Sequence, residues 1–229
     1  MALILNIDTS TSVCSVALAQ DGQVKAQKES NEGLNHSVLL GTYIDEVLKE
    51  AGISPHELDA VAVSMGPGSY TGLRIGISMA KGLCFGTGKP LIAVPTLQSL
   101  AQAVSSRLND RTAWYCPMID ARRMEVYTAF FDADNQVMVD TKAEIIDKDS
   151  FADILSARKV YFFGNGSDKV KDTLTSPTAN FIEGVETSAS YMVPVSERQF
   201  AAKAFEDVAY FEPFYLKDFI ATVAKKKVI

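Results

Sequence analysis

One sequence pattern occurs twice in the chain, and its spacing constrains the fold more than any other feature. In the first copy an apolar stretch ends at Ile7-Asp8, a short polar turn follows, and a second apolar stretch reaches a turn at Asp21-Gly22. In the second copy the apolar stretch ends at Ile119-Asp120, 112 residues later, and the corresponding turn lies near 132–135. Apolar segments separated by such turns predict β-hairpins. Because 112 residues is about half of the 229-residue chain, we expect two domains of related topology.

A polar stretch at 107–112 marks the boundary between these domains, which we place at 1–106 and 107–229. Each domain combines a β-meander with crossover helices, a mixture that predicts α/β layers. We expect the chain to finish with a helix from about Ala201 that packs back on the first domain.

The remaining elements follow from apolar periodicity and from helix-ending residues. A helix is expected from about Ser37 to Ala51, ending at Gly52, because glycine tolerates the left-handed cap. The other expected elements are strands over Ala60–Ser64, Pro90–Val94 and Val160–Phe163, and helices beginning near Thr96 and after Gly164–Ser167.

Composition excludes several classes of protein. The formal net charge is -6 and the acidic residues are spread along the chain, so no surface is expected to attract a polyanion by itself. No apolar run reaches the roughly 18 residues that a bilayer span needs, and the N-terminus does not resemble a secretion signal. Three scattered cysteines, Cys14, Cys84 and Cys116, suit buried thiols in a reducing compartment. We therefore expect a cytoplasmic protein without membrane contact.

A glycine-rich stretch, residues 64–83, follows the expected strand at Ala60–Ser64. It reads SMGPGSYTGLRIGISMAKGL, which lacks the lysine of a phosphate-binding P-loop and fails the dinucleotide fingerprint at Thr71. On a helix, Gly72, Gly76 and Ala80 share one face that another backbone can approach closely.

Apolar side chains flank this glycine face on both sides. Leu73 and Ile77 lie on one side of it. Ile75, Met79 and Leu83 lie on the other, so the apolar arc is wider than one sheet can cover. The second cover could be another helix of this chain or a separate subunit.

The side chains able to carry out chemistry are few. The two histidines, His36 and His56, are 20 residues apart and cannot bind zinc from one helix face. Asp8 and Asp120 each follow an apolar strand and could face phosphate across a cleft, as in a two-domain ATPase or kinase. Alternatively, each aspartate only orders its own turn. The Gly164–Ser167 turn could add a nucleoside contact.

Several motifs together resemble the TsaB family, also called YeaZ. They are ILNIDTST near the N-terminus, His36-Ser37 at the first helix, GPGSYTGLRIG over 66–76 and FYLKD over 214–218. The resemblance spans the whole chain. It implies an α/β fold of two duplicated actin-like domains, of the type shared by Hsp70 and sugar kinases, which agrees with the repeated hairpins.

The resemblance also implies a function. Members of this family are non-catalytic partners that activate TsaD in the synthesis of N6-threonylcarbamoyladenosine at position 37 of tRNAs reading codons that begin with A. TsaD holds a metal through a histidine pair, but Thr96 and Leu100 stand at the matching positions here, so no metal and no catalytic residue are expected. An ATPase or small-molecule kinase remains the alternative, and a metallopeptidase is a more distant one.

The resemblance implies partners as well. They are TsaD, the ATPase TsaE, a second copy when the chain is alone, and tRNA only through the complex. No cofactor is required by this chain, although ATP or ADP could bind at the complex.

Two groups of site residues follow from the resemblance. The family's partner contact maps to helices at about 36–51 and 71–85. The expected contact residues are His36, Leu39, Leu40, Tyr43, Val47, Gly72, Leu73, Gly76, Ile77 and Ala80. A vestigial nucleotide cleft is expected at Asp8, Ser10, Asp120, Gly164, Asn165 and Gly166.

Overall fold

A computed structural model describes residues 2–32 and 35–217 of the chain. The first half contains β1 (Leu3–Asp8), β2 (Cys14–Gln20), β3 (Gln23–Ser30), α1 (His36–Ala51), β4 (Ala60–Gly66), α2 (Tyr70–Thr87), β5 (Leu91–Pro95) and α3 (Thr96–Leu108). The second half contains β6 (Trp114–Asp120), β7 (Glu125–Phe131), β8 (Val137–Ile145), α4 (Ala152–Ala157), β9 (Val160–Phe163), β10 (Ala179–Ile182) and α5 (Ala189–Ala201). Two 3-10 helices span Pro55–Glu57 and Asp168–Val170.

The strands form two five-stranded sheets with the same topology. The first sheet has the order β3-β2-β1-β4-β5, and the second has the order β8-β7-β6-β9-β10. In each sheet the central strand pairs antiparallel with the next strand of the chain and parallel with a later one. Asp8 and Asp120 end the two central strands, at equivalent positions. The duplicated α/β architecture that the repeat predicts is therefore confirmed.

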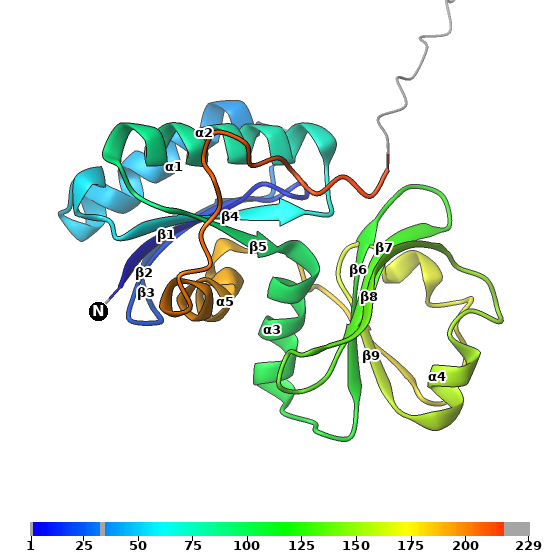
Figure 1. Ribbon diagram of the computed structural model, residues 1–229. Helices are drawn as coiled ribbons and strands as arrows, with labels where there is room; N and C mark the ends of the chain where they lie inside the picture. Colours follow the sequence, from blue (N-terminus) through cyan, green and yellow to red (C-terminus); the bar gives the residue numbers. More distant parts are fainter. Residues whose placement is uncertain (1, 33–34, 218–229) are drawn as a thin grey trace, which may run out of the picture.

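Helices cover both faces of the first sheet, as Figure 1 shows. Apolar residues of α1 and α2 pack on one face, in a core that includes Leu5, Val16 and Val63. Helix α5 packs on the other face, where Ala189, Met192 and Val195 meet Ile4 and Ile92. This part of the chain forms three layers.

The second sheet is covered mainly by α3 and α4. Leu97, Leu100 and Val104 of α3 pack against Tyr115 and Phe131 of the sheet. Leu155 of α4 joins the core on the opposite face. The boundary expected between residues 106 and 107 falls inside the last turn of α3, which lies between the two sheets (Figure 1).

Two of the expected helices are wrong. Helix α5 ends at Ala201 instead of beginning there, and the described part of the following segment, 202–217, is not helical. This segment bonds to the first sheet: Glu206 N donates to Leu91 O at 2.9 Å, and Phe214 N donates to Met65 O at 2.8 Å. Residues 218–229 lie outside the described residues.

The other wrong helix is the one expected after Gly164–Ser167, where only the short 3-10 helix Asp168–Val170 forms. The strand at 160–163 and the helices ending at Gly52 and beginning at Thr96 are confirmed.

The three cysteines are buried and unpaired, as the sequence predicts. Burial raises the pKa of the Cys14 and Cys84 thiols to about 11, so both stay protonated near neutral pH. Within the described residues, no helix combines the length and the apolar character that a membrane span requires.

The glycine face of α2 packs against the turn between β1 and β2. A Cβ atom on Gly72 would lie 2.1 Å from the carbonyl oxygen of Thr9, and one on Gly76 would lie 2.3 Å from Thr9 Oγ1. The Thr9 hydroxyl donates to the carbonyl of Gly72 at 2.7 Å. The close approach that the sequence predicts is therefore made by the chain's own turn.

We expect Gly72→Ala to lower the free energy of unfolding by about 1–3 kcal/mol or more, because the new methyl group meets backbone that cannot swing away. Gly82→Ala in the same helix is the matched control. Gly82 is exposed and a Cβ there meets nothing within 4 Å, so we expect Gly82→Ala to raise the free energy of unfolding by about 0.5–1 kcal/mol. Urea denaturation of both variants measures the difference, and equal stabilities would contradict this account.

Candidate functional site

The structure buries most of the residues expected to contact a partner. Eight of them lie in the core of this chain: His36, Leu40, Val47, Gly72, Leu73, Gly76, Ile77 and Ala80. Leu39 and Tyr43 are partly buried against the same core. These eight residues have little surface left for contact with a partner, because the strongest apolar stripes of α1 and α2 face the sheet beneath them, as such stripes usually do.

His36 is an example of this burial. Its ring is buried, and Nε2 lies 3.2 Å from the carbonyl oxygen of Val13 at the start of β2. The side chain therefore ties the beginning of α1 to the first sheet.

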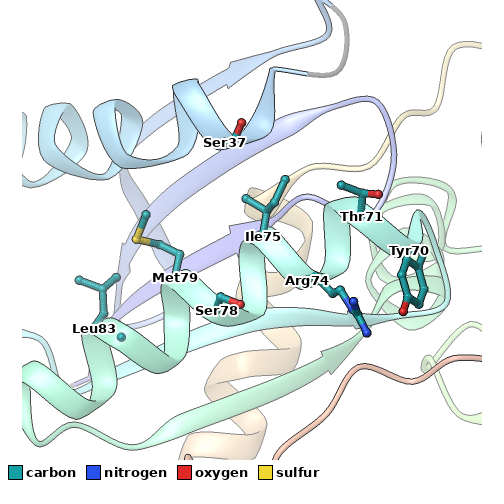
Figure 2. Close-up of a pocket in the computed structure, with 9 residues that line it drawn as sticks. Ser37, Tyr70, Thr71, Arg74, Ile75, Ser78, Met79 and Leu83 are labelled. Atoms are coloured by element: carbon teal, nitrogen blue, oxygen red, sulfur yellow. The ribbon is translucent and has the colours of Figure 1, made fainter.

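A groove lies instead on the outer side of the two helices (Figure 2). It has a volume of about 720 Å³ and is lined by Ser37, Tyr70, Thr71, Arg74, Ile75, Ser78, Met79, Gly82 and Leu83. Ile75, Met79 and Leu83 form a row along α2, each four residues from the next. The floor of the groove is therefore apolar.

The groove continues toward the C-terminal end of α1. Met79 and Leu83 also line a second hollow with Ile44, Leu48 and Ile53. A Cβ on Gly41 would lie 3.8 Å from Met79 Cε, so the absence of a side chain at Gly41 keeps this stretch open.

Two further apolar side chains of these helices are exposed but do not line the groove. Val38 of α1 is 71% exposed and Phe85 of α2 is 88% exposed. Apolar periodicity did not single out Val38, Gly41 and Phe85. It did indicate that Ile75, Met79 and Leu83 widen the apolar arc beyond what one sheet can cover, and this was the signal for the groove.

A polar corner closes the groove at the N-terminal end of α2. The Arg74 guanidinium lies 4.3 Å from the centre of the Tyr70 ring, and the Tyr70 and Tyr215 rings are 4.8 Å apart. Arg74 Nε donates to the Tyr215 hydroxyl at 3.0 Å. Tyr215 comes from the C-terminal segment, so residues distant in sequence build this corner.

The expected cleft residues of the first domain order their own turn. Asp8 Oδ1 accepts from Ser10 N at 2.9 Å and from Ser10 Oγ at 2.6 Å. Asp8 Oδ2 is buried without a hydrogen-bond partner among the described residues. Burial raises the pKa of the Asp8 carboxyl, and the bonds from Ser10 act in the opposite direction.

The second domain repeats this arrangement. Asp120 Oδ1 accepts from Arg122 N at 2.9 Å and also pairs with Lys169. Asn165 Oδ1 accepts from Asp120 N at 2.9 Å. Gly164 and Gly166 pack closely against the backbone of β6. The structure thus brings together Asp8 with Ser10, and Asp120 with the 164–166 loop, in two separate sets.

The β1–β2 turn fits a phosphate group poorly. Its hydroxyls are engaged within the protein: Thr9 with the Gly72 carbonyl, Ser10 with Asp8, and Thr11 with Thr187 Oγ1 at 2.6 Å. Phosphate is bound by donors that are free to point at it.

Thr96 and Leu100, which the family resemblance matches to metal-ligand positions, have internal roles here. Thr96 Oγ1 lies 2.6 Å from Ser64 Oγ, and Leu100 of α3 is buried against the second sheet. Among the described residues, no group of three or more His, Cys, Asp or Glu side chains could hold a metal ion.

We expect Asp8→Asn to be more stable than the wild type at about pH 8, with a difference that shrinks toward pH 4. The raised pKa means that the folded chain binds a proton more tightly than the unfolded chain. The stability due to this group is therefore complete below the ordinary Asp pKa and is lost as pH rises through the folded-state pKa. Asparagine keeps the acceptor for Ser10 and cannot ionise. Urea denaturation across this range measures the difference, and a difference independent of pH would contradict the assignment.

The chain is similar to known proteins in both sequence and fold. The model of a family described as "TsaD: tRNA N6-adenosine threonylcarbamoyltransferase" matches residues 30–225. The tRNA threonylcarbamoyladenosine biosynthesis protein TsaB of Bacillus subtilis (strain 168) is 33% identical over 224 residues, which cover 93% of each chain. TsaB of Escherichia coli (strain K12) is 42% identical over 57% of this chain and 55% of that protein.

Solved structures agree with these relatives. YeaZ from Pseudomonas aeruginosa has a TM-score of 0.81 and 27% identity, covering 94% of this chain and 100% of that chain. A tRNA N6-adenosine threonylcarbamoyltransferase of Nitratidesulfovibrio vulgaris (strain DP4) is 35% identical over 42% of this chain and 31% of that protein. The chain is therefore similar in sequence to TsaB proteins and, over part of its length, to a threonylcarbamoyltransferase.

Proposed function

The chain belongs to the TsaB (YeaZ) family, and we propose that it is a non-catalytic partner that activates TsaD in the synthesis of N6-threonylcarbamoyladenosine in tRNA. The modified position would be 37, in tRNAs reading codons that begin with A. The reaction would take place in the cytoplasm.

The observation that carries this proposal is the apolar groove between α1 and α2. The TsaD family model matches this chain over 30–225, a range that includes both helices. A TsaD chain with an equivalent helix pair can meet this one about a pseudo-twofold axis, in the manner of an isologous dimer. Ile75, Met79 and Leu83 would then form the apolar centre of the interface.

The assignment of catalysis to the partner has support from two sites. Thr96 and Leu100 replace metal ligands and are committed to internal packing. Asp8 and Asp120 are each engaged in their own turns, which also argues against the kinase alternative.

The expected contact with tRNA runs through the complex. The chain has a formal net charge of -6, and neutralising phosphates requires local positive charge, which the partner would supply. Contact with TsaE, a homodimer in the absence of TsaD, and ATP or ADP at the complex remain predictions from the family resemblance.

Reconstitution of tRNA modification tests the proposed function. Purified TsaD of the same organism should form threonylcarbamoyladenosine with this chain present and lose most of that activity without it. Full activity in the absence of the chain would overturn the proposal.

Met79→Glu tests the groove. A carboxylate buried without a partner costs several kcal/mol, so we expect TsaD to bind at least about 100-fold more weakly. Ile145→Glu is the matched control, because Ile145 is 71% exposed on β8 in the other domain and should leave affinity unchanged. Calorimetric titration measures both affinities, with circular dichroism confirming the fold. Tight binding by Met79→Glu would place the interface elsewhere.

A further inference from the structure

Arg74 is held in a defined position at one end of the groove. Its guanidinium stacks on Tyr70 at 4.3 Å, and its Nε donates to Tyr215 at 3.0 Å. An exposed arginine normally samples many rotamers, so two such contacts remove much of the entropy that binding would otherwise cost.

Tyr215 is itself fixed by the segment that carries it. The neighbouring Phe214 donates through its backbone N to Met65 O at 2.8 Å, and Phe214 O lies so close to Gly66 that a Cβ there would be 2.8 Å away. The FYLKD motif thus places the Tyr215 hydroxyl beside α2.

The outer part of the Arg74 guanidinium is left for another molecule. Arginine has five N–H donors, and Tyr215 takes only the one on Nε. Within the described residues no carboxylate forms an ion pair with Arg74. The bond to Tyr215 is the main cause that raises the pKa of the guanidinium, and the charge of Glu212 adds to it. The two Nη groups match the fork geometry of a carboxylate.

We propose that Arg74 is a prepositioned anchor for a carboxylate of the protein partner, and that Tyr215 is the positioning residue that holds it. This inference rests on the proposed function, because the carboxylate would come from the chain that fills the groove. A protein is favoured over RNA because Arg74 borders the apolar row of Ile75, Met79 and Leu83, which a phosphate backbone would not cover. Arginine and tyrosine are typical of residues that dominate interface energies.

Binding of purified TsaD to the full chain tests the anchor. We expect Arg74→Gln to weaken binding about 10-fold to 100-fold, and Arg74→Lys to recover little of the loss, because lysine lacks the fork and the Nε–H donor. Arg158→Gln is the matched control, since Arg158 stacks on Trp114 at 4.0 Å in the other domain and should change nothing. Affinity of the wild type should also fall more steeply with salt than that of Arg74→Gln.

Tyr215→Phe tests the positioning role separately. It removes only the hydroxyl, so we expect binding about 3-fold to 10-fold weaker in the wild-type background and no further loss in the Arg74→Gln background. Equal losses in both backgrounds would show that Tyr215 contacts the partner independently.

The outcomes separate the two proposals. If TsaD binds Arg74→Gln as tightly as the wild type while Met79→Glu fails to bind, the anchor is wrong and the groove stands. If wild-type chain does not bind TsaD, both proposals fail. If Arg74→Gln keeps its affinity for TsaD but weakens tRNA binding by the complex, the ligand is a phosphate and the carboxylate assignment is overturned.

Discussion

The contact between the β1–β2 turn and α2 determines how the proposed interface is presented. Thr9 lies against Gly72 and Gly76, which have no side chain to hold the turn away. This contact fixes the rotation of α2 about its axis, because only one face of the helix carries the glycines. With that face turned inward, Ile75, Met79 and Leu83 lie at its edge, partly buried beside α1. The apolar row stays partly exposed because it flanks the face that the fold turns inward.

The sequence predicted the duplicated α/β fold because hairpins and turns leave local signals. Asp21 and Gly22 both have positive φ, and Gly52 and Gly88 end α1 and α2 in left-handed conformations. The interface residues were harder to predict because α2 is apolar or small around most of its circumference. Periodicity locates such faces but does not say which one the sheet covers. The choice between them depended on a contact with Thr9, more than 60 residues away in sequence.

The C-terminal segment could not be predicted for a related reason. Its backbone N–H groups at Glu206 and Phe214 donate to backbone atoms of β5 and β4, and backbone partners leave no pattern in the side chains of the segment. Its other bonds to the first domain come from Arg74 and Lys81 of α2, which are distant in sequence. The short polar turns at Asp8 and Asp120 left a clear sequence signal. It suited either a cleft that faces phosphate or a turn ordered by its own aspartate. The structure shows both aspartates bonded to the residue two positions later, so each turn is ordered locally whatever else it once bound.

The same topology serves different purposes in the two halves. The element after β3 is α1, with 16 residues, whereas the element after β8 is α4, with 6. The element after β4 is α2, with 18 residues, whereas the one after β9 is a 3-10 helix of 3 residues. A groove between two helices requires both to run side by side for several turns, and among the described residues only those of the first half provide this. The third helices, α3 and α5, have 13 residues each and are kept in both halves, since they fill the space between the sheets. Shortening of the outer helices in one half therefore leaves the interior intact and confines the proposed docking surface to the other.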